Sequence, residues 1–158
     1  MSDIDVDAGT VRVERTIDAP AEAVFDAWTN PEVLRRWFKP EPTHELAAAD
    51  VDLRVGGAYR VVVHDVDSGD DFAAFGTYRE ITRPQRLVYS WIWEGTGPYA
   101  GHETEVAVTF AEQQPGRTTV TIEHAGLLDD EASQEDHRRG WTGLLDSLAS
   151  VGPELAAR

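Results

Sequence analysis

The chain has 158 residues, which is enough for one domain with a buried core, and 41% hydrophobic with 27% charged residues is an ordinary globular composition. The absence of cysteine excludes disulfides, thiolate chemistry and cysteine-based zinc sites. The formal net charge of −15 should repel nucleic acid and anionic membranes.

Two expectations concern the environment of the protein. Acidic residues outnumber basic ones by 29 to 14, and Lys39 is the single lysine. This balance is typical of a halophilic source, where salt screens self-repulsion, although a GC-rich genome also replaces lysine with arginine. The sequence contains no run of eighteen apolar residues and no basic, apolar leader. We therefore expect a cytoplasmic protein without membrane insertion.

The first part of the chain predicts a strand followed by two short helices. Residues 1–9 are expected to form an acidic tail, and residues 10–158 a single domain. Alternation of apolar and polar side chains over residues 11–17 predicts a half-buried strand. Residues 20–38 carry apolar side chains at helical spacing, with a break at Asn30-Pro31, and two prolines then predict a loop.

The middle of the chain predicts a meander of antiparallel strands, giving six to seven strands with the first. Turns rich in Gly, Pro and Asp separate the candidates, which cover residues 44–53, 57–66, 72–81, 85–94, 102–112 and 117–126. The Asp-rich turn at residues 65–71 has the acidic spacing of a calcium loop, but its glycine and glutamate positions do not fit. A solvated hairpin tip is the better interpretation.

A long helix is predicted from about residue 129 to residue 155. Its apolar stripe consists of Trp141, Leu144, Leu145, Leu148 and Val151, which need a sheet to cover them. The strand positions expected to face inward would form the covering surface of that sheet. They are Tyr59, Val61, Val63, Leu87, Tyr89, Trp91, Trp93, Val106, Val108, Phe110, Val120, Ile122 and His124. Gly140 and Gly143 weaken the helix, so they indicate either close backbone approach to the sheet or space for a ligand beneath the helix.

Five motifs in this order resemble one family. They are TIDAPAEAVFDAWTNPEVLRRWF, DVDLRVGGAYR, ITRPQRLVYSW, TTVTIEHAGL and HRRGWTGLLDSL. Together they are similar to the domain homologous to the C-terminal part of the activator of Hsp90 ATPase (AHSA1-like), in the START/Bet v 1-like (SRPBCC) superfamily. The resemblance spans residues 11–151. It implies an α+β helix-grip fold, in which a curved antiparallel sheet wraps a C-terminal helix and leaves a hydrophobic cavity.

The candidate site is that cavity, with an apolar or aromatic small molecule as the expected partner. The five tryptophans either fill the core or surround a flat ligand. His124 and His137 either cap an element through the backbone or act on a ligand. The residues expected to line the cavity are Trp37, Phe38, Tyr59, Val61, Tyr89, Trp91, Trp93, Val108, His124, His137, Trp141 and Leu145, with Trp37 and Phe38 at its mouth.

No catalytic residue, metal site or cofactor is assigned from the sequence, because the histidines lack metal-ligand spacing and no serine has a paired base. Three functions stay open. A binding protein is favoured over an enzyme. A cyclase- or dehydratase-like enzyme would use His124, His137, Tyr89 or Glu94 for proton transfer. A co-chaperone would act through its outer surface. A homodimer through a sheet edge also stays open.

Overall fold

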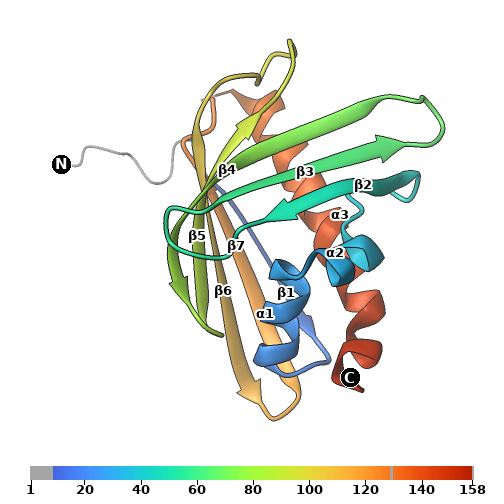
Figure 1. Cartoon of the computed structure of the whole chain (residues 1–158), viewed down its shortest axis with the longest axis vertical. Helices are drawn as coiled ribbons and strands as arrows, with labels where there is room; N and C mark the ends of the chain where they lie inside the picture. Colours follow the sequence, from blue (N-terminus) through green and yellow to red (C-terminus); the bar gives the residue numbers. More distant parts are fainter. Residues whose placement is uncertain (1–8, 129, 158) are drawn as a thin grey trace.

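The computed structural model describes residues 9–128 and 130–157 and shows one seven-stranded antiparallel sheet with three helices (Figure 1). The strands lie in the order β1-β7-β6-β5-β4-β3-β2. Their bounds are β1 Val11–Ile17, β2 His44–Val51, β3 Ala58–Asp65, β4 Asp71–Thr82, β5 Arg86–Trp93, β6 Thr104–Gln114 and β7 Arg117–Ala125. Each strand from β2 onward therefore pairs with its neighbour in the chain, as the predicted meander requires.

The three helices are α1 Ala21–Thr29, α2 Pro31–Trp37 and α3 Glu131–Ala156. The break between α1 and α2 falls at the predicted Asn30-Pro31. There the Asn30 side chain accepts a hydrogen bond from the Glu32 backbone N–H, and Pro31 occupies the first helical turn, where no N–H partner is needed. Among the described residues, no helix is long and apolar enough to span a membrane.

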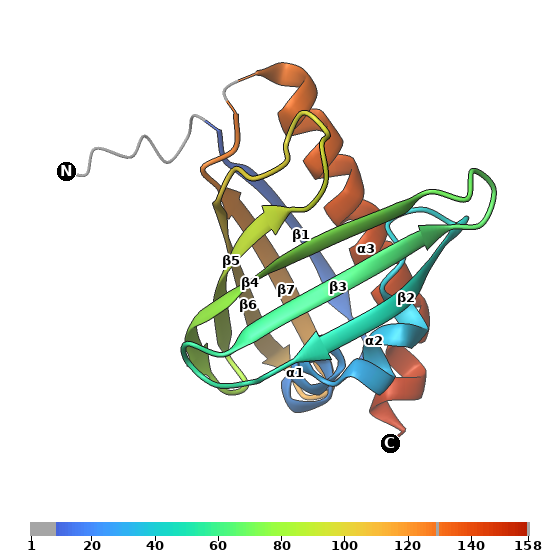
Figure 2. The same cartoon turned by 45° about the horizontal axis from the view of Figure 1, so that its top comes forward.

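The sheet curls around α3, while α1 and α2 lie at the end of the molecule nearest the C-terminus (Figures 1 and 2). The alternating strand positions predicted to face inward are buried, apart from the half-buried Trp93. They pack against Trp141, Leu144, Leu145 and Leu148 of α3, all at most 4% exposed. The helix-grip architecture predicted from the sequence is confirmed.

Two other predicted segments are the acidic N-terminal tail and the Asp-rich turn. The expected acidic tail falls outside the described residues except for Gly9, which is buried and accepts a hydrogen bond from the Leu127 N–H. The Asp-rich turn is a hairpin tip between β3 and β4. Its Asp65 carboxylate accepts hydrogen bonds from the Asp67 and Ser68 backbone N–H groups, so it serves the turn itself.

Candidate functional site

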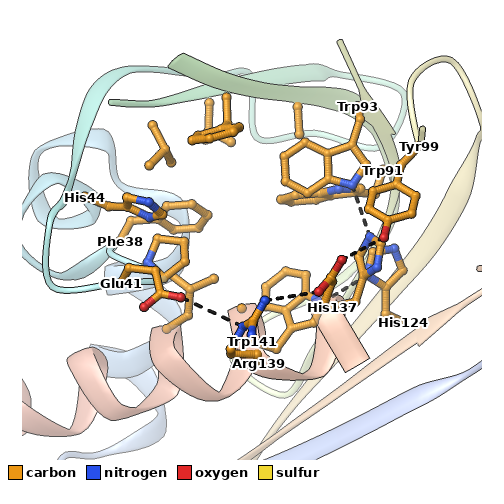
Figure 3. A pocket seen from close by; sticks show the side chains of 18 residues that line it. Phe38, Glu41, His44, Trp91, Trp93, Tyr99, His124, His137, Arg139 and Trp141 are labelled. Carbon is orange, nitrogen blue, oxygen red and sulfur yellow. Dashed lines mark hydrogen bonds and ion pairs between the residues drawn. The ribbon is translucent and has the colours of Figure 1, made fainter. Parts of the chain in front are cut away.

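A cavity of about 220 Å³ lies between the concave side of the sheet and the N-terminal half of α3 (Figure 3). The loop between α2 and β2 and the loop between β5 and β6 border its opening. The residues that line it are Phe38, Pro40, Glu41, His44, Val61, Val63, Phe72, Ala74, Trp91, Trp93, Tyr99, His124, Asp136, His137, Arg139, Gly140, Trp141 and Leu144. Helix and sheet separate here because a helix cannot follow the whole concave face of a curled sheet.

Indole rings form one wall of the cavity. Trp91 and Trp93 are alternate residues of β5 and so project from the same face of the sheet. The centroid of the Trp91 ring lies 5.3 Å from that of Trp93 and 5.3 Å from that of Trp141 on α3. These edge-on and tilted contacts are the favoured geometry for aromatic pairs, and they fix the shape of this wall.

The His124 imidazole is held in one tautomer by its neighbours. The Thr104 hydroxyl donates its single proton to the Trp91 carbonyl oxygen, at 2.8 Å, so it must accept from His124 Nε2–H, at 2.7 Å. His124 Nδ1 then accepts from the Trp141 indole N–H at 2.9 Å. Burial, reinforced by the adjacent His137 ring, lowers the pKa of His124 well below its usual value. His124 is therefore neutral, and both of its nitrogens are engaged.

His137 is fixed in the opposite tautomer. Its Nδ1–H donates to the Ser133 carbonyl oxygen at 2.7 Å, one turn earlier in α3. Its Nε2 accepts from the Trp93 indole N–H at 3.1 Å (Figure 3). Burial lowers the pKa of His137, although the Ser133 carbonyl and the Asp136 carboxylate oppose this effect. Neither imidazole has a free nitrogen with which to accept a proton from a ligand.

A chain of polar groups crosses the rim of the cavity. The Tyr99 hydroxyl donates to Asp136 Oδ2 at 2.8 Å, and Arg139 Nη2 donates to Asp136 Oδ1 at 3.1 Å. Arg139 Nε lies 4.0 Å from Glu41 Oε1 across the opening (Figure 3). This chain connects the β5–β6 loop, α3 and the α2–β2 loop. The rim carries two carboxylates and one guanidinium.

Two buried nitrogen atoms of the lining have no hydrogen-bond partner among the described residues. They are the Trp91 indole Nε1 and His44 Nδ1. His44 Nε2 lies 3.5 Å from Asp65 Oδ2, which favours the proton on Nε2 and leaves Nδ1 as an acceptor. An unpaired buried polar group costs about 1–3 kcal/mol. Two lining residues therefore carry one unused donor and one unused acceptor, both shielded from solvent.

Two of the three glycines of α3, Gly140 and Gly143, have different roles. A Cβ at Gly140 would meet nothing within 4 Å, and Gly140 lines the cavity. A Cβ at Gly143 would lie 1.9 Å from the Pro40 carbonyl oxygen. Gly143 thus allows close approach of the α2–β2 loop to the helix, whereas Gly140 leaves space open. The close approach at Gly143 is to a loop and not to the sheet, which the sequence had suggested, and whether a ligand occupies the space at Gly140 stays a prediction.

The structure brings seven of the expected lining residues together around the cavity: Phe38, Val61, Trp91, Trp93, His124, His137 and Trp141. The other five lie in the packed core beside it. Trp37 and Tyr59 are held there by hydrogen bonds, from the Trp37 indole N–H to the Ala27 carbonyl and from the Tyr59 hydroxyl to the Ser90 carbonyl.

Tyr89, Val108 and Leu145 are the remaining three, and each is at most 5% exposed. Tyr89 accepts a hydrogen bond from the Trp28 indole N–H on α1. These positions face inward as predicted, but α1 and α2 fill the space in front of them. Placing them in the cavity wall is corrected accordingly: inward orientation does not distinguish the filled end of the sheet from the open end.

Several lining residues were not among those expected to line the cavity. Asp136, Gly140 and Leu144 lie four residues apart along α3, on the face shared by His137 and Trp141. That spacing is a usable signal, because residues at i, i+3 and i+4 share a helix face. Tyr99, Glu41 and His44 lie in or next to loops, where no periodicity marks their direction.

The proton-transfer candidates outside the histidines do not line the cavity. Glu94 forms a bidentate ion pair with Arg60, with nitrogen–oxygen distances of 2.6 and 2.9 Å. The hydrogen bonds from Arg60 hold the pKa of Glu94 below its usual value. Burial raises the pKa of Tyr89 far above the physiological range. Among the described residues, no group of three or more His, Asp or Glu side chains is arranged to hold a metal ion.

Comparison with known proteins identifies the family. The model of activator of Hsp90 ATPase homolog 1-like protein (AHSA1) matches residues 18–152. Protein CV1439 from Chromobacterium violaceum is 28% identical, with a TM-score of 0.81 covering 91% of this chain and 96% of that one. The AHSA1 protein SPO3351 from Silicibacter pomeroyi is 26% identical, with a TM-score of 0.78 covering 94% and 98%.

A third structure, PFC0360w, an Hsp90 activator from Plasmodium falciparum, is 22% identical, with a TM-score of 0.68 covering 90% of this chain and 94% of that one. This likeness shows the fold alone. No protein of curated function matches the chain. The family model covers most of the sequence, including both walls of the cavity. The chain therefore belongs to the family of activator of Hsp90 ATPase homolog 1-like proteins.

Proposed function

We propose that this protein binds a small apolar or aromatic molecule in the cavity between α3 and the sheet. The observation that carries the proposal is the combination of an unfilled apolar space of about 220 Å³ with a buried, unpaired Trp91 indole N–H in its wall. Small-molecule sites are mostly apolar with a few polar groups that orient the ligand. A ligand acceptor near Trp91 would remove the cost of the unpaired donor.

The cavity volume limits the size of the guest. An apolar protein cavity of about 150 Å³ takes up benzene, and drug-sized pockets begin near about 300 Å³. A cavity of about 220 Å³ lies between these values. It suits a molecule with one or two fused rings, and a steroid would require the loops at the rim to move.

Two other functions have less support. An enzyme of the cyclase or dehydratase type would need a base in the cavity, but both nitrogens of His124 and of His137 are already paired. A co-chaperone role rests on a neighbour whose likeness extends to the fold alone. Neither alternative uses the unpaired indole of Trp91.

Binding can be tested with naphthol as a two-ring probe. The indole N–H signal of Trp91, identified by its loss in Trp91→Phe, should shift as naphthol is added. Gly140→Phe should abolish this shift, because its ring would project into the space that lies open beyond Gly140. Thr142→Phe adds the same ring at an exposed position of α3 and should leave binding unchanged.

Circular dichroism of each variant establishes that it is folded, and the smaller Gly140→Leu provides a second occluding variant. Native mass spectrometry of protein isolated from its own cells should also show a co-purifying small molecule. An unshifted Trp91 signal at saturating naphthol, or naphthol binding that survives both Gly140 variants, would remove the support for this function.

A further inference from the structure

The hydrogen-bond donors around the cavity are almost all used by the protein itself. The indole N–H groups of Trp93 and Trp141 donate to the two imidazoles. The N–H groups of His124 and His137 donate to Thr104 and to the backbone. Among the described lining residues with a buried N–H, Trp91 is left with an unused donor. A single neutral donor can serve a hydroxyl or a carbonyl oxygen.

An anionic ligand would find no partner charge inside. The two histidines are neutral and held so by their tautomers, because a second proton on His124 Nδ1 would face the Trp141 N–H. The interior wall is otherwise formed by apolar side chains such as Val61, Val63 and Leu144. A carboxylate moved from water into such surroundings loses its hydration without compensation.

The charges at the rim also disfavour an anionic ligand. Glu41 and Asp136 place two negative charges there, and the one positive charge, that of Arg139, lies between them. The chain as a whole carries a net charge of −15. An approaching anion is therefore repelled by the field of the protein before it reaches the opening, whereas a neutral molecule is not.

From this arrangement we infer that the cavity selects uncharged aromatic molecules bearing a hydroxyl or carbonyl group and rejects the corresponding aromatic carboxylates. The inference rests on the proposed function and adds the chemical class of the ligand. The phenol or ketone oxygen accepts from the Trp91 N–H. The selection arises because most donors of the lining are already bonded within the protein and because the rim is acidic. It requires no difference in shape between the neutral molecule and the corresponding carboxylate.

The test compares naphthol with naphthoate, substituted at the same ring position, by titration calorimetry at neutral pH. Naphthol is uncharged and naphthoate is ionised under these conditions. We expect naphthoate to bind at least about tenfold more weakly. Equal or tighter binding of naphthoate overturns the inference while leaving the proposed function intact. Absence of binding for both probes removes the proposed function and the inference together.

A gain-of-function variant separates charge selection from fit. Asp136→Asn removes one negative charge from the rim and one carboxylate partner from Arg139. Naphthoate affinity should rise by about threefold or more relative to the naphthol affinity of the same variant. Asp146→Asn, at an exposed site of α3 outside the cavity, makes the same change in net charge and should raise naphthoate affinity less than Asp136→Asn does.

A rise of equal size in Asp146→Asn would show that only the overall charge of the protein matters and would overturn the role of the rim. An unchanged naphthoate affinity in Asp136→Asn would overturn it as well. Asp136→Asn retains a side chain that can accept the Tyr99 hydroxyl proton, so the β5–β6 loop keeps its attachment to α3.

Discussion

Replacement of Gly140 or of Gly143 in α3 by alanine should give opposite stability changes, because the same methyl group enters different surroundings. At Gly143 the added Cβ would lie 1.9 Å from the Pro40 carbonyl oxygen and 2.9 Å from its carbon. The separation from the oxygen must grow by about 1.5 Å to reach an ordinary contact of 3.4 Å. Both atoms belong to backbone, so neither can rotate away.

The magnitudes follow from two opposing terms. Alanine in place of glycine inside a helix stabilises it by about 1 kcal/mol. Overpacking against backbone costs about 1–3 kcal/mol, and the short contact at Gly143 places this variant at the upper end. Gly143→Ala should therefore lose about 2 kcal/mol of unfolding free energy. Gly140→Ala should gain up to about 1 kcal/mol, since a Cβ there meets nothing within 4 Å.

Urea and thermal unfolding of the two variants provide the assay. The free energies of unfolding should differ by about 3 kcal/mol, with unchanged dependence on urea concentration. For a domain of this size that corresponds to melting temperatures roughly 6–12 °C apart. Equal shifts in the two variants, or a Gly143→Ala protein as stable as the parent, would refute the close contact between α3 and the α2–β2 loop.

Three further predictions concern buried polar groups and surface charge. Because folding lowers the pKa of His124, first through burial, the unfolded chain binds more protons below about pH 6.5, and the free energy of unfolding should fall as pH decreases through that window. His124→Gln, which cannot titrate, should reduce the slope by up to about 1.4 kcal/mol per pH unit; an unchanged slope would contradict the assignment. Thr104→Val removes the hydroxyl that His124 Nε2 and the Trp91 carbonyl share, and should lower the free energy of unfolding by about 1–3 kcal/mol in chemical denaturation; a neutral effect would contradict this hydrogen-bond network. Raising KCl from about 0.1 to 1 M shortens the screening length from about 10 to 3 Å. With a net charge of −15 the melting temperature should then rise, because repulsion among the negative charges is screened. A melting temperature that stays constant or falls would argue against this repulsion.

The sheet and the helix α3 that packs against it could be predicted from the sequence, because both follow from the periodicity of apolar side chains. Alternation over β5 and β7 directs Trp91 and Ile122 to the same concave face, and the helical spacing of Trp141 and Leu148 directs them to meet it. The break at Asn30-Pro31 was equally local, because proline lacks the N–H that an interior helical position requires. These features depend on neighbours in the chain.

The division of inward residues between core and cavity could not be predicted in this way. Trp37 and Trp91 both face inward and are at most 5% exposed, yet Trp91 lines the cavity and the Trp37 indole is tied to the Ala27 carbonyl. What separates them is where α1 and α2 fill the curl of the sheet. That position depends on packing between segments far apart in the sequence.

The sequence by itself determined the strands, the helices and the faces they bury, because hydrophobic period and turn residues act over a few positions. Only the tertiary structure decided that Gly140 borders open space while Gly143 touches Pro40, and that Tyr99 reaches Asp136 across the rim. These contacts join a helix to loops whose direction is set by three-dimensional packing. The pattern of side chains along each segment carries no information about that direction.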